Sequence, residues 1–254
     1  IFELVLKKGA VLFEEPKNLL EYENVRIHAK YNAILGATSS GKETMKEIEN
    51  ATHITSQTMP AYLRRLDELL DLVGRKDPVL GKERLGRYQT KDNFFKFWYK
   101  FILPNQTPLN LGNTKLVSDL IKQDLNSYIG RIFEDIVREL LVLYNTKEIK
   151  GLKLNFENIG SWWDRNNNEI DVLAYNLKEK NFLLGEVKWT NKKLDTDVIE
   201  ELERKSKYLN YGGTYKFLFV SKNGFTEKAL KKMQDIGAIH FDLKEMEELF
   251  SKAS

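Results

Sequence analysis

The sequence predicts an α/β protein, in which a helical N-terminal part precedes a C-terminal part with a mixed central sheet flanked by helices. Two observations support this prediction. Apolar residues recur at helical spacing through much of the chain before residue 146, and beyond Gly151 short apolar segments typical of strands alternate with helical ones. The length of 254 residues suffices for one large domain or two modest ones.

The composition is typical of a folded intracellular protein. Apolar residues make up 42% of the chain and charged residues 30%. We find no apolar run near the ~20 residues that span a bilayer and no secretory leader, so we expect a cytoplasmic protein without a membrane partner. Cysteine is absent, which excludes disulfides and cysteine-bound zinc. The net charge of +3 neither requires nor excludes DNA as a partner.

The first 91 residues predict two units. Residues 1–24 are amphipathic and lack a helix start signal, so we expect them to be the tail of a preceding helical module. Residues 25–91 predict a winged helix-turn-helix, with three helices and a hairpin. The helices are expected around residues 27–35, at ETMKEIENA and at QTMPAYLRRLDELLDL with Ser56 as N-cap, and the hairpin at VGRKDPVLGKERLGRYQT.

The stretch GATSSGKE, residues 36–43, nearly matches a phosphate-binding loop. That loop requires Ser or Thr after its lysine to bind Mg²⁺, whereas Glu43 would place a carboxylate beside the phosphates. A phosphate-binding loop also follows a buried strand, whereas here apolar residues at helical spacing lead into Gly36. We therefore expect Gly36 and Gly41 to bracket a turn between two helices, and we expect this chain to bind no nucleotide.

Residues 92–118 predict an aromatic connector helix followed by a linker. The rings of DNFFKFWYKFIL lie all around a helix, which favours core packing between the two parts over a stacking platform for single-stranded nucleic acid. Residues 104–113 contain two prolines and a glycine and are typical of a linker.

Residues 119–254 predict the α/β part. The longest helical periodicity in the chain, at residues 119–145, indicates a long helix. The segments that follow give the order helix, three strands, helix, strand, helix, strand. The strands are expected at LNFENIGSWW, NEIDVLAYNL, NFLLGEVKWT, TYKFLFVSK and AIHFDL, and the helices near residues 197–210 and 226–236.

Charged residues interrupt two of these strands where a buried strand should carry none. Asp171 lies in NEIDVLAY, and Glu186 and Lys188 lie in FLLGEVKW. Residues two apart in a strand point to the same side of the sheet, so Glu186 and Lys188 project together. A buried carboxylate is costly unless it is paired or binds a metal. Because the ligands are oxygens without His or Cys, we predict a Mg²⁺ or Mn²⁺ site formed by Asp171 and Glu186.

This set of residues predicts phosphodiester hydrolysis. The reaction needs a metal that polarises the phosphate and acidifies a water, and a cation near the nucleophile, for which Lys188 is the candidate. Glu134 on the long helix is a candidate fourth catalytic group. Glu169, two residues before Asp171, is a candidate supporting neighbour. A structural ion pair in a domain that keeps its fold without activity is the alternative.

At these residues the chain resembles a known superfamily. An aspartate followed by E-x-K on the next strand, after a helix bearing Glu, looks like the PD-(D/E)xK core of restriction enzymes and archaeal four-way-junction resolvases. YIGRIFEDIVRELL, SWWDRNNNEIDVLAY and GEVKWTNKK more closely resemble the C-terminal domain of a family of archaeal P-loop ATPases. In that family an ATPase precedes a winged helix and this nuclease-like domain. GATSSGKETMKEIENAT resembles its winged helix and DNFFKFWYKFILPN its connector.

The resemblance covers nearly the whole chain and implies a restriction-endonuclease-like fold for residues 119–254. Asp171 matches the first strand acid of the motif, Glu186 and Lys188 match E-x-K, and Glu134 matches the helix acid. Ile170 stands where the motif name has Pro. The implied function is a Mg²⁺-dependent nuclease-like activity on DNA beside the ATPase module, which this chain lacks. The alternative is a catalytically inactive module that binds nucleic acid or protein and positions partners for that ATPase.

Basic residues of the predicted winged helix are candidate phosphate contacts. They lie on the third helix and in the hairpin: Arg64, Arg65, Arg75, Lys76, Lys82, Arg84 and Arg87. Acidic residues lie among them, so DNA binding and a packing role both stay open. The oligomeric state stays open as well.

Overall fold

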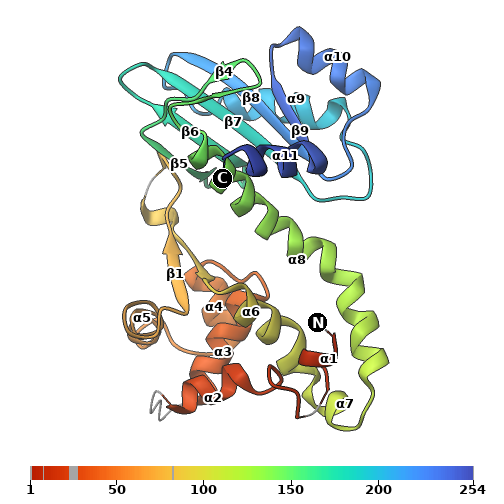
Figure 1. Cartoon of the computed structure of the whole chain (residues 1–254). Coiled ribbons are helices and arrows are strands. Elements are labelled where there is room, and N and C mark those ends of the chain that lie inside the picture. Colours follow the sequence, from red (N-terminus) through yellow and green to blue (C-terminus); the bar gives the residue numbers. More distant parts are fainter. Residues whose placement is uncertain (1, 8, 23–27, 82, 254) are drawn as a thin grey trace. The chain divides into compact units, whose positions relative to one another are not determined.

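Figure 1 shows the computed structural model of the chain, which describes residues 2–7, 9–22, 28–81 and 83–253. The described chain divides into two compact units. One comprises Ile1–Asp77 and Glu83–Asp124, and the other comprises Pro78–Lys82 and Leu125–Ser254. The long helix α8 (Thr114–Leu143) contributes its first turns to the first unit and the rest to the second.

The first unit is mainly helical. Its regular elements are α1 (Phe2–Val5), α2 (Glu15–Tyr22), α3 (His28–Ser39), α4 (Met45–Thr52), α5 (Met59–Arg64), η1 (Arg65–Leu69), β1 (Val73–Lys76), η2 (Glu83–Leu85), β2 (Arg87–Thr90), α6 (Asn93–Phe97), η3 (Trp98–Ile102), η4 (Leu103–Asn105) and α7 (Gln106–Asn110). Strands β1 and β2 pair antiparallel, with Val73 opposite Thr90. Three helices followed by an antiparallel pair is the order that the sequence predicted for residues 25–91, although residues 23–27 lie outside the described residues.

The stretch GATSSGKE differs in part from the expectation. Helix α3 continues through Gly36 to Ser39, and the turn lies at Ser40 and Gly41, where Gly41 has a φ of 83°. The helix extends because Thr38 and Ser39 are buried and their hydroxyls both contact the Thr90 hydroxyl of β2, at 2.8 and 3.0 Å. The prediction that Gly36 begins the turn was therefore wrong. A helix, and not a strand, leads into this segment.

Two other local expectations need correction. Ser56 is not the N-cap of the third helix, because Thr58 holds that position and Pro60 occupies the first turn, where its missing N–H costs nothing. Residues 104–113, expected to be a linker, contain the helical segments η4 and α7.

The aromatic segment is core, as predicted, whereas its packing between the two parts stays a prediction. The described part of the chain buries Phe95, Trp98, Tyr99 and Phe101 in α6 and η3. Trp98 Nε1 donates to the Phe13 carbonyl at 2.7 Å. These rings therefore stabilise the first unit.

The second unit is built on a mixed sheet, which confirms the predicted α/β class. Within the described residues this sheet has five strands in the order β5-β6-β7-β8-β9 (Figure 1). Its first three strands are antiparallel, and β7, β8 and β9 are parallel. The strands are β5 (Asn158–Trp163), β6 (Glu169–Asn176), β7 (Asn181–Lys188), β8 (Thr214–Ser221) and β9 (Ile239–Asp242).

Helices cover both faces of this sheet. Apolar residues of α8 and α11 (Leu243–Ala253) pack on one face, with Val172 of β6 and Val187 of β7. Apolar residues of α9 (Thr196–Ser206) and α10 (Glu227–Asp235) pack on the other, with Leu173 and Leu184. The alternation of buried residues along each strand places successive side chains in different cores.

Two features of the second unit were not expected. A short hairpin, β3 (Glu148–Ile149) with β4 (Leu152–Lys153), follows α8. Helix α11 follows β9 directly and begins with a reciprocal cap: Glu245 N donates to Asp242 Oδ1, and Asp242 N donates to Glu245 Oε2. Across the described residues, no helix is long and apolar enough to pass through a lipid bilayer.

Candidate functional site

The structure brings together three of the charged residues predicted from the sequence. Lys188 Nζ donates to Glu186 Oε1 at 2.5 Å and lies 3.9 Å from Asp171 Oδ2. Glu186 is only 5% exposed, in spite of its charge. A carboxylate so far removed from water requires the positive charge beside it.

The parallel pairing of β7 with β8 fixes Glu186 and Lys188. Glu186 lies opposite Phe219 and Lys188 opposite Ser221, so both belong to the regular ladder. Because they are two residues apart in one strand, their side chains leave the same face. The contact between them is the geometry expected from the E-x-K spacing.

An extra residue in β6 positions Asp171. Gly160 pairs with Leu173 and Trp162 with Ile170, so β6 has one more residue than β5 between these two pairs, which is a β-bulge. Pairing of β6 with β7 ends at Val172 and Gly185, so the backbone of β7 beyond Gly185 has no partner in β6. The side chain of Asp171 takes the place of that backbone partner, because the Val187 N–H donates to Asp171 Oδ2 at 2.8 Å.

Arg138 on α8 holds the backbone of this irregular segment. Its Nη1 donates to the Asp171 carbonyl at 2.5 Å and to Ser161 Oγ at 2.8 Å, while its Nη2 contacts Asp135. Ser161 Oγ in turn donates to the same carbonyl. Arg138 lies four residues after Glu134, one turn along the helix. This role was not predicted, because nothing in the sequence marks the bulge that leaves the Asp171 carbonyl open.

Glu134 is electrostatically linked to the strand acids. Burial, and then the charge of Asp171, raise the pKa of Glu134 to about 8. Burial and the charge of Glu186 raise the pKa of Asp171 to about 6. Burial opposes the charge of Lys188, but Glu186 and Asp171 outweigh it and raise the Lys188 pKa above its ordinary value. Buried carboxylates that resist ionisation indicate a place where an added cation lowers the energy.

Glu169 lies at the start of β6, opposite Trp163 of β5. Its negative charge also raises the pKa of Glu134. The structure therefore puts Glu169 close enough to act on the acids electrically, and its supporting role stays a prediction.

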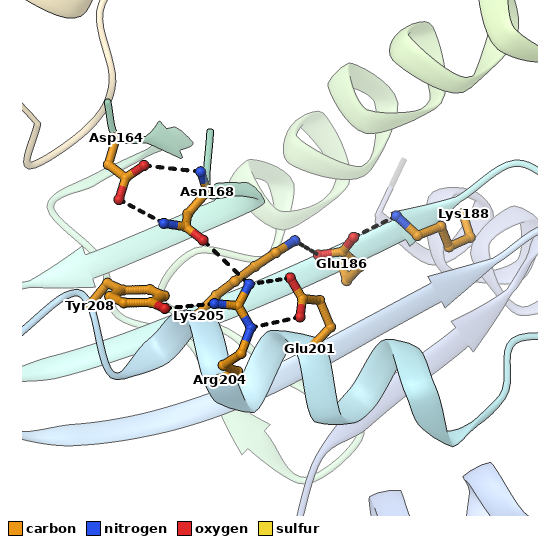
Figure 2. Close-up of polar contacts among 8 residues, drawn as sticks. All are labelled: Asp164, Asn168, Glu186, Lys188, Glu201, Arg204, Lys205 and Tyr208. Atoms are coloured by element: carbon orange, nitrogen blue, oxygen red, sulfur yellow. Dashed lines mark hydrogen bonds and ion pairs between the residues drawn. The ribbon is translucent and has the colours of Figure 1, made fainter. Parts of the chain in front are cut away.

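A second lysine, which was not predicted from the sequence, reaches the site. Lys205 Nζ, on the last turn of α9, donates to Glu186 Oε2 at 3.2 Å, and its side chain is 12% exposed. Figure 2 shows Lys188 and Lys205 reaching Glu186 from two sides. A signal was present, because Lys205 follows Leu202 by three residues, on the buried stripe of the helix.

A polar network anchors α9 next to Lys205. The Arg204 guanidinium donates twice to Glu201, at 2.8 and 2.6 Å, and also to Tyr208 Oη at 2.6 Å. It reaches Asn168 Oδ1 at 3.3 Å, and Asn168 is held by Asp164 in the turn between β5 and β6 (Figure 2). The network connects α9 to the turn that leads into β6.

The donor set fits a hard divalent cation. Asp171 and Glu186 offer carboxylate oxygens, and Glu134 lies within range of their charges. Among the described residues, however, no three His, Cys, Asp or Glu side chains stand together as a ready-formed metal ligand group. The two lysines at Glu186 occupy oxygens that a metal would need. Asp171 and Glu186 as metal ligands therefore stay a prediction.

The basic residues predicted to contact DNA are dispersed among acids. Arg75 pairs with Asp77 at 2.9 Å, and Arg87 approaches Glu43 at 3.7 Å. Lys82 lies outside the described residues. The others are exposed: Arg64, Arg65, Lys76 and Arg84. DNA binding by this set stays a prediction.

The loop between β1 and β2 makes two hydrogen bonds to residues of the second unit. Its segment Pro78–Lys82 belongs to the second unit. There Val79 N donates to the Ser161 carbonyl at 3.0 Å, and Tyr211 Oη donates to the Leu80 carbonyl at 2.6 Å. These contacts hold the hairpin tip, and the packing and DNA-binding alternatives both stay predictions.

Comparisons with known proteins show what the chain is similar to. Residues 98–202 match the model of a family, DUF234, described as archaeal and bacterial proteins of unknown function. An uncharacterized protein of Methanocaldococcus jannaschii, MJECL04, is 32% identical over 220 residues, which are 85% of this chain and 47% of that protein. The chain therefore spans about half the length of this relative. No solved structure matches the chain. The chain is thus similar to archaeal and bacterial proteins over the part that carries Glu134, Asp171, Glu186 and Lys188.

Proposed function

We propose that the second unit is a Mg²⁺- or Mn²⁺-dependent nuclease of the PD-(D/E)xK type that hydrolyses DNA phosphodiesters. The observation that carries the proposal is the meeting of Asp171, Glu186 and Lys188 where β6 and β7 part. A lysine that touches one buried strand acid and lies near another is the arrangement that such a reaction requires.

Each residue has a separate task in this proposal. Asp171 and Glu186 hold the divalent cation, which when bound polarises the phosphate and acidifies the attacking water. The ammonium of Lys188 orients that water or balances the developing charge. Glu134, whose pKa is raised to about 8, keeps its proton near neutral pH while no cation is bound.

We infer further that the first unit includes a winged helix and that the chain works beside a P-loop ATPase module. The order α3, α4, α5, β1, β2 supports the winged helix, and the resemblance of the sequence supports the ATPase module. The relative from Methanocaldococcus jannaschii is about twice as long as the matched segment, which leaves room for such a module in that protein. DNA is the partner that this arrangement favours.

A second candidate function rests on the charge balance at Glu186. Two lysines at 2.5 and 3.2 Å neutralise this carboxylate together with Asp171. Such a balanced cluster also suits a catalytically inactive module that positions DNA or a protein for the ATPase. The two candidates differ in whether the site takes up a divalent cation.

Cleavage of labelled DNA tests the proposed nuclease. Duplex, single-stranded and branched substrates are incubated with the wild type, Glu186→Gln and Glu248→Gln in Mg²⁺ or Mn²⁺. Glu248 lies exposed on α11 and is the matched control. We expect cleavage by the wild type and Glu248→Gln and loss of cleavage in Glu186→Gln. Equal cleavage by all three proteins contradicts the site, and no cleavage by the wild type favours the inactive module.

A further inference from the structure

We propose that Lys205 is an exchangeable cation of the site, which neutralises Glu186 when no metal is bound and contacts the phosphodiester of the nucleic acid once a divalent metal occupies Glu186. This inference rests on the proposed function and adds a residue that the E-x-K motif does not contain.

The contacts at Glu186 show why a lysine must move when a metal binds. Each of its carboxylate oxygens accepts from one lysine, Oε1 from Lys188 at 2.5 Å and Oε2 from Lys205 at 3.2 Å. A divalent cation on this carboxylate would lie within a few ångströms of both ammonium groups. Like charges at such a distance repel strongly in a buried site. At least one lysine must therefore move when a metal binds.

The geometry favours Lys205 as the lysine that moves. Lys188 is two residues from Glu186 on a strand paired along its length with β8, and it also approaches Asp171. Lys205 makes the longer contact and comes from a different element, α9. Its ammonium sits on a flexible four-carbon stem, so the side chain can swing while the helix stays in place.

The network around Arg204 connects α9 to the β5–β6 turn, which favours a helix that stays in place when the Lys205 side chain moves. Arg204 binds Glu201 and Tyr208 within the α9 region and Asn168 in the β5–β6 turn (Figure 2). Lys205, the next residue, therefore leaves from a defined point on the edge of the site. Once the Lys205 ammonium leaves Glu186, the length of its own side chain limits how far it can move.

The balance of charges at the site indicates the chemical class of its ligand. Asp171 and Glu186 are balanced by Lys188 and Lys205 when no metal is present. A divalent cation adds two positive charges, and a group with negative charge on oxygen then completes the site. A phosphodiester has this chemistry, and ammonium groups bind phosphate oxygens as point charges. The released Lys205 supplies one such contact.

Metal binding without DNA tests the exchange directly. Mn²⁺ alone is titrated into the wild type, Lys205→Met, Lys205→Arg and Lys207→Met, with binding followed by electron paramagnetic resonance. Lys207 is exposed just beyond α9 and serves as the matched control. We expect Lys205→Met to bind Mn²⁺ about tenfold more tightly, because the competing positive charge is gone. Lys205→Arg and Lys207→Met should bind like the wild type.

Tighter binding is a result that simple damage to the site would not give. Unchanged or weaker Mn²⁺ affinity in Lys205→Met overturns the exchange and leaves the proposed nuclease intact. If neither the wild type nor Lys205→Met binds Mn²⁺, the predicted metal site is wrong, and the proposed function is contradicted together with this inference. Lys205→Gln, which keeps a donor to Glu186 without the charge, replaces Lys205→Met if that variant does not fold.

Cleavage at saturating Mn²⁺ tests the second half of the proposal. Despite its tighter metal binding, Lys205→Met should cleave DNA on the order of 100-fold more slowly, the loss typical of one missing contact to developing charge. Lys207→Met should cleave at the wild-type rate. A wild-type rate in Lys205→Met overturns the assigned phosphate contact.

Discussion

The carboxylate of Asp171 accepts a hydrogen bond from the main-chain N–H of Val187, at 2.8 Å. Val187 stands between Glu186 and Lys188, so this bond joins the acid of β6 to the E-x-K segment of β7. It forms where the β6–β7 ladder has ended at Val172 and Gly185. A side chain thus continues the sheet at the point where the candidate site begins.

Substitution of Asp171 separates the structural bond from the charge. Asp171→Asn keeps an oxygen that accepts from Val187, whereas Asp171→Ala leaves that N–H without it. We expect Asp171→Ala to unfold more easily than Asp171→Asn, by about 1–3 kcal/mol in urea denaturation. Equal stability of the two variants would show that the bond contributes nothing to the fold.

The contribution of Glu134 to the stability of the metal-free protein should fall as the pH rises from about 4 to about 8. Burial and Asp171, with smaller contributions from Glu169 and Asp135, raise the pKa of Glu134 to about 8, while Arg138 opposes them. The folded state then holds a proton that the unfolded state has released, so stability is greatest below the unfolded pKa and is lost as the pH rises through the folded pKa. The check is urea unfolding in EDTA at pH 6 and pH 8.

Glu134→Gln is the variant that isolates this effect. It cannot ionise, so its loss of stability between pH 6 and pH 8 should be clearly smaller than that of the wild type. Glu248→Gln, exposed on α11, should behave like the wild type. The same loss in all three proteins would mean that Glu134 ionises normally.

Glycine at position 185 is required by the close approach of β6 and β7. A Cβ there would meet the Cβ of Val172 at 2.9 Å and Leu218 Cδ2 at 3.3 Å. We expect Gly185→Ala to destabilise the protein by about 1–3 kcal/mol in chemical denaturation, because the strands on both sides must shift. Since Glu186 is the next residue, the same change should weaken Mn²⁺ binding.

Gly130 on α8 gives the matched control for that substitution. Among the described residues, a Cβ at Gly130 would meet only Trp189 Cβ, at 3.8 Å, which is ordinary contact. Alanine is favoured over glycine inside a helix by up to about 1 kcal/mol, so Gly130→Ala should be neutral or stabilising. If both variants lose the same stability, crowding at β7 is not the cause.

The GATSSGKE segment should not bind nucleotide. Lys42 is exposed after the turn at Gly41, and α3 precedes it. Lys42→Ala should therefore change stability by no more than ~0.5 kcal/mol. A nucleotide at 100 times its Kd would add ~2.7 kcal/mol of stability, which a thermal-shift titration detects. Stabilisation by ATP that disappears in Lys42→Ala would contradict this interpretation.

The sequence predicted the parts of the site that depend on strand periodicity. Glu186 and Lys188 stand out because a buried strand seldom carries charge, and their spacing of two residues was enough to place them on one face. Asp171 stood out for the same reason. Its actual position depends on the extra residue in β6, which no alternation pattern reveals.

The parts that were missed depend on tertiary contacts or on short signals. Lys205 was hidden because a lysine on an otherwise charged helix looks exposed, although it continues the stripe of Leu202. Gly36 was placed in a turn because glycine favours turns, but burial of Thr38 and Ser39 against β2 kept the helix intact. The D-x-x-E cap of α11 was readable in the sequence and was overlooked.

The most direct test of the central claim is Mn²⁺ binding, measured by titration calorimetry at pH 8 on the wild type, Asp171→Asn, Glu186→Gln and Glu248→Gln. We predict that the wild type and Glu248→Gln bind the ion at millimolar or lower concentration. The two site variants should lose more than ~10-fold in affinity, a loss that even groups supporting metal ligands commonly cause. Equal affinity in all four proteins, or no binding by the wild type, would contradict a metal site at Asp171 and Glu186.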